Sequence, residues 1–324
     1  MVAPWTRATA GSRPLAMVIG EFGAKGVIDT SSHDRIEHAM VLLHSICAGA
    51  PNSQHALYLF TPTEQDHAID VRDRRIGRIR SLRCFPSVSI RRFPLRLVNR
   101  SIRSWFPAGH LFVHGEVSRC QPSWCCGTCA LAQWAKLWLP TWLEREMPDA
   151  RQLVVLDYDL VALRSAEHLW SLPLGGAMMA VHGSACGITS AAMVFNVSAM
   201  RTFLSAHNTA ARRAMLPALA AHTDYTNSDQ DWVVAMTQAP SLSKAVASMH
   251  VLDNACEERY VRRRDQTCTP ANDSLSVTRT FRHFNCMAKS QQVSFYQAQL
   301  VKAGQRAALE QVRSFAPSRR LERV

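Results

Sequence analysis

The stretch Leu153–Leu163, LVVLDYDLVAL, constrains the fold of this chain more than any other segment. Its four leading aliphatic residues are typical of a strand that is buried on both faces. Asp157 and Asp159 carry the charges of this stretch, and a carboxylate buried among aliphatic side chains costs several kcal/mol unless a partner compensates it. The stretch therefore predicts a buried strand that ends at Asp157, with both acids facing a site at its carboxyl end.

The amino-terminal part of the chain predicts an α/β fold. Arg13–Gly23, RPLAMVIGEFG, has the composition of a first buried strand, and His55–Thr61, HALYLFT, has that of a second. Between them, His33–Ala50 places apolar residues at helical spacing. A strand, a helix and a strand in this order require a parallel sheet, which binds ligands at the carboxyl ends of its strands.

Further elements are expected on both sides of the acidic strand end. Thr128–Glu146 is an amphipathic helix interrupted at Pro140, and the helix that begins in NSDQDWVVAM has Ser228 as its candidate N-cap. Two apolar strands, AMMAVH and AAMVFNV, and a helix that starts near Met200 lie between them. Ser294–Phe315 is expected to form one helix in front of a basic tail.

The size and composition of the chain fit a single large globular domain. Of its 324 residues, 47% are apolar and 19% are charged, which provides enough apolar surface for a core and excludes a disordered chain. We expect one domain over 13–300, in two halves at about 13–163 and about 164–300. A C-terminal helix and basic tail over 301–324 would follow it.

The chain is strongly basic. Its 37 Lys and Arg against 25 Asp and Glu give a net charge of +12, which favours polyanionic partners such as nucleotides, nucleic acids or acidic membrane surfaces. Arginines concentrate between Arg72 and Arg103, either as a solvated basic face or as a binding surface, and no recognised nucleic-acid motif accompanies them. No apolar run is long enough to span a membrane, and the first residues lack the apolar core of a signal peptide. Membrane association is therefore not visible in the sequence.

Ten cysteines are many for a chain of this length. Cys256 and Cys268 flank a basic loop and could form a disulfide if the chain enters a secretory compartment. Four others cluster in CQPSWCCGTC, where they could form a zinc knuckle or a redox pair, or remain loop thiols, free or disulfide-bonded. No second ligand pair lies at zinc-finger spacing, which favours thiols. The clustered residues are Cys120, Cys125, Cys126 and Cys129.

The spacing of Asp157 and Asp159 suits a hard cation. Residues i and i+2 of an extended segment point to the same side, so both carboxylates can supply oxygen ligands to one ion. A divalent ion held there could neutralise a diphosphate. The alternatives are an exposed turn, a pair of helix-capping acids, or the acidic motif of a haloacid-type phosphatase. The phosphatase motif lies near the amino terminus and is normally followed by Thr or Gly-Thr, whereas Leu160 and Val161 follow here.

The segment LVVLDYDLVALRSAEHLW resembles the DxD region of family 8 glycosyltransferases, a retaining group with the GT-A fold. Three further blocks resemble family segments in the same order, namely GITSAAMVFNVSAMR, SDQDWVV and HFNCMAK, the last with His283 and Lys289 at the family's spacing. Upstream, AKLWLP is similar to the segment that carries the family's basic nucleotide contact, which places Lys136 there. The resemblance spans roughly Leu15–Tyr296 and is nearest to glucoside xylosyltransferase-like members.

The resemblance implies a GT-A fold, with a mixed, mostly parallel sheet flanked by helices. It makes 13–163 the nucleotide-binding half and 164–300 the acceptor half. It implies a metal-dependent retaining transferase that moves xylose, glucose or galactose from a UDP-sugar to an acceptor hydroxyl. The implied partners are the UDP-sugar and a glycan or glycoprotein acceptor, and nucleic acid is not among them. It also suggests the Golgi or the secretory pathway, although no signal or anchor segment is seen in the sequence.

Carried over residue by residue, the resemblance assigns the site. Asp157, Asp159 and His283 would bind one Mn²⁺ or Mg²⁺, and the imidazole nitrogen suits Mn²⁺ better. Asp229 and Gln230 would be the catalytic residues, beside the anomeric carbon of the donor sugar, where they stabilise its developing positive charge. The remaining contacts to the UDP-sugar would come from Lys136, Tyr158, Thr189, Ser190 and Lys289.

Other interpretations stay open. Thr189, Ala191 and Cys286 stand where the family has Asn, Gly and Gly, so a degenerate, non-catalytic member that binds nucleotide is the first alternative. A basic protein that binds nucleic acid is the second. Asp229 could merely favour the amino end of a helix through the helix dipole, and Lys136 could extend from an amphipathic helix to solvent.

Overall fold

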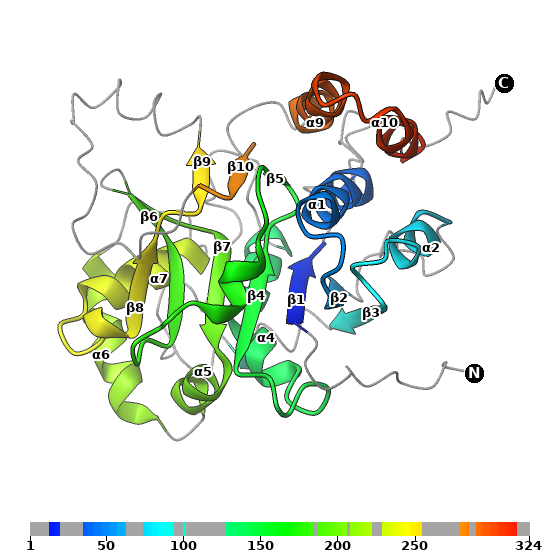
Figure 1. Ribbon diagram of the computed structural model, residues 1–324. Coiled ribbons are helices and arrows are strands. Elements are labelled where there is room, and N and C mark those ends of the chain that lie inside the picture. The colour runs from blue at the N-terminus through cyan, green and yellow to red at the C-terminus, as the bar shows by residue number, and fades with distance from the viewer. Residues whose placement is uncertain are drawn as a thin grey trace, which may run out of the picture.

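Seven strands form the central sheet of the protein in a computed structural model that describes residues 13–19, 35–62, 74–93, 100–101, 128–184, 187–205, 208–221, 229–254, 279–284 and 290–315. The strands lie in the order β3, β2, β1, β4, β7, β6, β8 (Figure 1). β7 is antiparallel to both of its neighbours, and the other neighbouring pairs are parallel, which confirms the predicted mixed, mostly parallel sheet. The strands are β1 Arg13–Val18, β2 His55–Pro62, β3 Ser87–Phe93, β4 Gln152–Leu156, β6 Met179–Ser184, β7 Gly187–Asn196 and β8 Val246–Met249.

The predicted strand–helix–strand opening is present. β1 pairs in parallel with β2, with Arg13 opposite His55, and α1 (Arg35–Gly49) lies between them in the chain. The first strand ends at Val18, earlier than the expected Gly23. The carboxyl ends of β1, β2 and β4 consequently lie along the same edge of the sheet, because these three strands are parallel.

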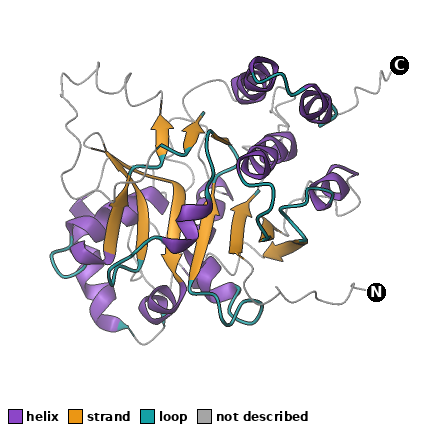
Figure 2. Cartoon of the chain, in the orientation of Figure 1, coloured by secondary structure: helices purple, strands orange, loops and turns teal. Residues whose placement is uncertain are grey.

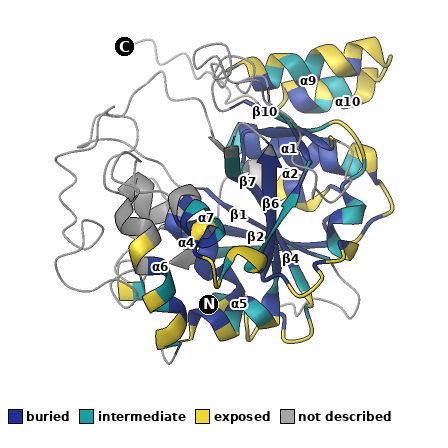
Figure 3. Ribbon diagram, turned by 90° about the vertical axis from the view of Figure 1, so that its left-hand side faces the viewer, coloured by how far each residue is buried: buried dark blue, intermediate teal, exposed yellow. Residues whose placement is uncertain are grey.

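Helices cover both faces of the sheet (Figure 2). Alternate residues of β1 enter two separate hydrophobic cores: Leu15 and Met17 pack in the core of α1, whereas Ala16 and Val18 pack in the core of α4 and α7. The strands between the two layers are largely buried (Figure 3). The first layer contains α1, α2 Arg74–Arg80, α9 Ser290–Lys302 and α10 Arg306–Arg313; the second contains α4 Thr128–Trp142, α5 Val197–Leu204, α6 Thr209–Ala221 and α7 Asp229–Gln238.

A second, three-stranded sheet follows directly after the acidic segment. Its strands are β5 (Leu160–Ala162), β10 (Phe281–His283) and β9 (Leu252–Asn254), in that order. β10 runs antiparallel to β5 with His283 opposite Leu160, and parallel to β9. This sheet brings a segment from near the carboxyl terminus to the carboxyl end of β4.

The C-terminal region corrects one expectation. The single helix expected over Ser294–Phe315 is two helices, α9 and α10, and α9 begins four residues earlier, at Ser290. Gly304 lies between them with φ of 69°, a left-handed conformation that glycine adopts without steric cost. The break allows both helices to pack on the α1 layer: the Tyr296 hydroxyl of α9 lies 2.7 Å from His44 Nδ1, and Gln311 of α10 lies on the other side of the same ring.

A disulfide between Cys47 and Cys84 joins α1 to the segment before β3, with Cα atoms 5.5 Å apart. The sequence did not predict this pair. The expected Cys256–Cys268 pair lies outside the described residues, as do Cys120, Cys125 and Cys126, and the side chain of Cys129 is not described either. Across the described part of the chain, no helix combines the length and the apolar character needed to span a membrane.

Candidate active site

A buried lysine holds two of the predicted acids together at the carboxyl end of β4. Lys136 Nζ lies 2.9 Å from Asp157 Oδ1 and 2.8 Å from Asp229 Oδ2, and it also donates to the carbonyl oxygen of Ser190 at 3.4 Å. Lys136 is 3% exposed and Asp229 is 2% exposed. The three charged groups come from α4, the end of β4 and the first residue of α7, so the assembly exists only in the folded chain.

The environment of α4 explains why Lys136 does not reach solvent. Its neighbours Trp134, Leu137 and Trp138 are buried in the core that also contains Trp232 of α7. Lys136 therefore points inward with them, and the alternative that it extends to solvent is wrong. Asp229 occupies the amino end of α7, as the helix-dipole alternative expected, and it pairs with Lys136 as well.

The charged groups of this cluster shift one another's pKa values. Burial disfavours the charged lysine, but Asp157 and Asp229 outweigh burial and raise the pKa of Lys136. Burial also raises the pKa of Asp157; Lys136 opposes this shift, and the carboxylates of Asp159 and Asp229 add to it. Asp157 and Asp229 share the Lys136 ammonium group, and Asp159 lies near enough to raise the pKa of Asp157, so the carboxylates outnumber the ammonium group and the excess negative charge suits a cation.

Asp159 and His283 form a second buried contact next to the first. Asp159 Oδ1 lies 3.6 Å from His283 Nε2, and their side chains are 7% and 3% exposed. The backbone fixes this approach, because His283 of β10 lies opposite Leu160 of β5 and the amide of Phe284 donates to the carbonyl oxygen of Asp159 at 3.0 Å. The structure thus brings the downstream imidazole to the acidic strand end, and it shows Asp159 in a buried position instead of an exposed turn.

The donor set fits a divalent cation in part. Metal–ligand distances near 2 Å allow two ligands of one ion to lie roughly 3–4 Å apart, which the Asp159–His283 contact satisfies. His283 Nδ1 is buried and has no hydrogen-bond partner among the described residues, so the ring is not committed elsewhere within them. Asp157, in contrast, is turned to Lys136, and the described residues contain no ready-made cluster of three His, Cys, Asp or Glu ligands. For all three predicted ligands to bind one metal ion, the Asp157 carboxylate would have to contact the ion as well as Lys136.

The other predicted site residues lie around this cluster or outside the described part of the chain. Thr189 and Ser190 are on β7, and the next carbonyl oxygen along that strand, of Ala191, accepts from the amide of Asp157 at 2.8 Å. Tyr158 is 9% exposed. Three residues lie outside the described part of the chain, namely Ser228, Cys286 and Lys289, and so does the side chain of Gln230.

Sequence reasoning missed a buried glutamine beside the acids. Gln292 of α9 is fully buried, and its side-chain amide donates to the carbonyl oxygens of Tyr158 at 2.9 Å and of Leu160 at 2.8 Å. A glutamine in a polar helical stretch such as SQQVSFYQAQ gives no sign of burial. Only the packing of α9 against α1 and β5 reveals the contact.

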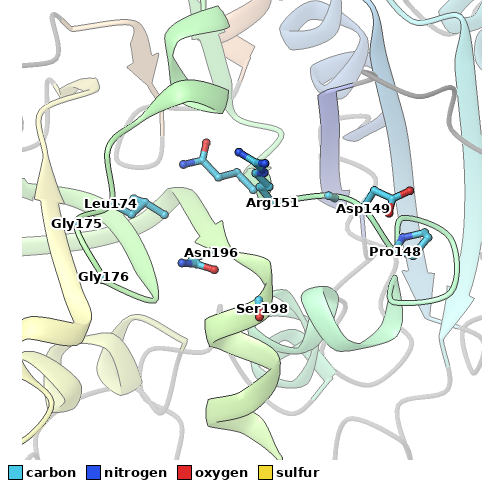
Figure 4. Close-up of a pocket in the computed structure, with 10 residues that line it drawn as sticks. Pro148, Asp149, Arg151, Leu174, Gly175, Gly176, Asn196 and Ser198 are labelled. Carbon is cyan, nitrogen blue, oxygen red and sulfur yellow. The ribbon is translucent and has the colours of Figure 1, made fainter.

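A hollow of about 490 Å³ lies at the other end of β4 (Figure 4). Gln152 begins β4 and lines this hollow, whereas Asp157 follows the last residue of the same strand, so the hollow is separate from the acidic cluster. Asn196, which also lines it, is the N-cap of α5 and accepts from the amide of Ala199. The lining residues are Pro148, Asp149, Ala150, Arg151, Gln152, Leu174, Gly175, Gly176, Asn196 and Ser198.

Solved structures with a similar fold are glycosyltransferases. Mouse xyloside xylosyltransferase 1 in its apo form is 13% identical, over 85% of this chain and 98% of that one, with a TM-score of 0.50. The galactosyltransferase LgtC in complex with donor and acceptor sugar analogues is 10% identical, over 88% of this chain and 95% of that one, with a TM-score of 0.51. An active-site mutant of LgtC gives a TM-score of 0.52 at 10% identity, over 87% and 94% of the two chains.

These similarities establish the architecture. No protein-family model matches the sequence, and no curated protein matches it either. The chain has the GT-A glycosyltransferase fold. The predicted fold class is thereby confirmed, and membership of family 8 stays a prediction, since identities of 10–13% report on fold alone.

Proposed function

We propose that this protein is a metal-dependent glycosyltransferase that moves a sugar from a UDP-sugar to an acceptor hydroxyl. The observation that carries the proposal is the cluster of buried Lys136 and Asp229 with half-buried Asp157, next to the Asp159–His283 contact, at the carboxyl end of β4 in a GT-A fold. Ligands of parallel α/β sheets bind at this edge. The donor sugar we propose is xylose, glucose or galactose, as the sequence resemblance implies; the similar folds of a xylosyltransferase and a galactosyltransferase are compatible with the first and the last of these.

The cluster supplies groups suited to the departure of UDP. In the transfer, the bond between the anomeric carbon and the diphosphate oxygen breaks and a bond to the acceptor oxygen forms. UDP leaves with the electron pair of the broken bond, and the proton of the acceptor hydroxyl passes to the departing UDP or to water. Asp157, Asp159 and His283 would hold Mn²⁺ or Mg²⁺, which supplies Lewis-acid stabilisation of the diphosphate charge when bound. Retention of configuration is part of the proposal, because the sequence resemblance to a retaining family implies it.

The remaining residues of the cluster orient these ligands. Lys136 is enclosed by Asp157 and Asp229, so we propose that it positions the two acids and balances their charge, in place of the phosphate contact that the resemblance implies. Asp229 and Gln230 follow each other at the amino end of α7, where they would face the donor sugar. An anionic carboxylate there stabilises positive charge that develops at the anomeric carbon. Tyr158, Thr189, Ser190 and Lys289 would complete the donor contacts.

The test is metal-dependent release of UDP. Purified protein is incubated with UDP-xylose, UDP-glucose and UDP-galactose, with Mn²⁺, Mg²⁺ or chelator, and UDP is measured with and without simple glycoside acceptors. We expect Mn²⁺-dependent release with one donor, and at least about a hundredfold loss in Asp157→Ala, which removes a charge at the reacting centre. Asp149→Ala, an exposed aspartate at the other end of β4, is the matched control and should keep wild-type rates.

The first alternative, a non-catalytic nucleotide-binding member, is distinguished in the same assay. Its motivation is the engagement of Asp157 by Lys136, together with Thr189 and Ala191 at positions where the family has Asn and Gly. Binding of UDP without turnover of any donor would favour that alternative. Absence of UDP binding in the presence of Mn²⁺ would rule out both.

The second alternative, nucleic-acid binding through the arginine-rich segment, is less well supported by the structure. Arg91 forms a part-buried ion pair with Glu146 at 2.9 Å, and Arg78 donates to the carbonyl oxygen of Ser314. These two arginines therefore serve contacts within the protein. Salt-dependent binding of single- or double-stranded DNA or RNA would revive this alternative.

A further inference from the structure

A buried glutamine connects the C-terminal helix α9 to the segment that carries the two acids. Gln292 is fully buried, and its amide nitrogen donates to the carbonyl oxygens of Tyr158 and Leu160. These carbonyl groups lie on either side of Asp159. We propose that Gln292 is a positioning residue, which holds Asp159 in the orientation that meets His283. The inference rests on the proposed function of the same site.

The surrounding hydrogen bonds define the orientation of the Gln292 amide. Its nitrogen faces the carbonyl oxygens of Tyr158 and Leu160 and, at 3.4 Å, that of His38; carbonyl oxygens only accept, so the NH₂ group must lie on that side. Its oxygen Oε1 faces His38 Nδ1 of α1, so His38 carries a hydrogen at Nδ1. The reversed amide would place oxygen against two carbonyl oxygens and NH₂ against the ring. One side chain therefore links α9, α1 and the acidic segment in a single arrangement.

Several parts of the fold hydrogen-bond to the backbone of the acidic segment. The amide of Asp157 donates to Ala191 of β7, the carbonyl of Asp159 accepts from Phe284, and the amide of Ala162 donates to the Ser45 hydroxyl of α1 at 2.8 Å. Gln292 holds the two carbonyl groups between these points. Without its NH₂ group, two carbonyls enclosed by protein would lose strong donors, and the turn at residues 157–160 would gain alternative conformations.

Gln292 lies close in sequence to His283, which links its contact with the acidic segment to the proposed metal site. His283 ends β10, and α9 begins at Ser290, so the segment that delivers the imidazole returns within ten residues to hold the backbone of the acids. α9 packs against both α1 and β5 at this point (Figure 1). The pairing of β10 with β5 brings His283 to Asp159, and in this proposal the docked helix α9 keeps the Asp159 backbone in place for that contact. Affinity for Mn²⁺ and UDP should depend on Gln292 although it lies outside the predicted ligand set.

The test compares Gln292→Met with Gln291→Met. Methionine keeps the length of the buried side chain and removes both donors, while Gln291 is the exposed neighbour on the same helix. Hydrogen–deuterium exchange is followed for peptides that cover residues 153–163. We expect exchange there to rise at least about tenfold in Gln292→Met and to stay at the wild-type rate in Gln291→Met. Gln292→Asn, which is one methylene shorter and cannot reach both carbonyls, replaces Gln292→Met if that variant does not fold.

A second measurement separates positioning from mere stability. The affinity for UDP is measured by calorimetry with Mn²⁺, and we expect the dissociation constant to rise at least about tenfold in Gln292→Met at temperatures where circular dichroism shows it fully folded. Unchanged exchange over residues 153–163 would overturn the inference, as would faster exchange with unchanged UDP affinity. If the wild-type protein does not bind UDP with Mn²⁺, the proposed function fails, and the exchange data still decide whether Gln292 holds the acidic segment.

Discussion

The substitution Lys136→Met removes the cation between two carboxylates and keeps a side chain of similar length. Lys136 Nζ lies 2.9 Å and 2.8 Å from the oxygens of Asp157 and Asp229. At an effective dielectric constant of about 20, each contact is worth roughly 6 kcal/mol before desolvation is counted. Desolvation cancels most of this gain in the intact cluster, but removal of one partner leaves buried charge uncompensated, which costs about 3–5 kcal/mol.

We expect Lys136→Met to lower the free energy of unfolding by about 3 kcal/mol at pH 7, the lower end of that range, because 31% of the Asp157 side chain is exposed and keeps part of its hydration. The measurement is urea-induced unfolding followed by circular dichroism and tryptophan fluorescence. Lys244→Met is the matched control, because Lys244 is exposed, and it should stay within about 0.5 kcal/mol of wild type.

A double substitution tests the cause. In Lys136→Met combined with Asp229→Leu, the more deeply buried of the two carboxylates disappears with its partner, so we expect recovery of at least about 1 kcal/mol relative to Lys136→Met alone. A loss below about 1 kcal/mol in Lys136→Met would show that the buried charges are not left uncompensated. A double variant whose loss equals the sum of the two single losses would also contradict the explanation, because additive losses mean that the groups do not interact.

Two further predictions concern parts of the fold away from the site. Cys84→Ser should lower the free energy of unfolding by about 4 kcal/mol, because the Cys47–Cys84 disulfide closes a loop with a sequence separation of 37. Urea unfolding with and without a reductant measures this effect. A wild-type protein whose unfolding does not change with reductant would contradict the prediction. His55 is buried without a hydrogen-bond partner among the described residues, and burial first and the charge of Arg13 second lower its pKa from 6.5 to about 4. The unfolded chain therefore binds the proton first, and stability should fall by about 3 kcal/mol as the pH drops from 6.5 to 4, whereas His55→Phe should lack this component when unfolding is measured across that range.

Several features of the candidate site could be predicted from the sequence because they are local. Four aliphatic residues followed by two acids define a strand end, whatever the rest of the chain does. The acids themselves lie in a turn after β4, where Asp157 meets Lys136 and Asp159 meets His283, so the extended geometry that was expected to align their carboxylates is absent there. The parallel opening followed from the order of a strand, a helix and a strand. The approach of His283 was expected from a block resemblance, and the pairing of β10 with β5 provides its structural basis.

Sequence patterns were insufficient where a residue's partner lies far along the chain. Lys136 and Gln292 are ordinary members of helices by composition, and nothing in their neighbours indicates that one meets two acids and the other two carbonyl groups. Cys47 and Cys84 were two of ten cysteines, and spacing does not identify a pair among so many. Gly304 itself could have indicated the break between α9 and α10, but the residues on both sides have helical spacing, which favoured one continuous helix.

Periodicity and residue type act over a few neighbouring residues, and they were enough to define the strand–helix–strand opening, several later helices and strands in their order, and the acidic strand end. Packing decides instead which polar groups meet in the interior. The elements that each bring one polar side chain to the end of β4 are α4, α7, β10 and α9. A buried polar group must find its partner within hydrogen-bond distance, and only the packing of helices on both faces of the sheet fixes which groups come that close.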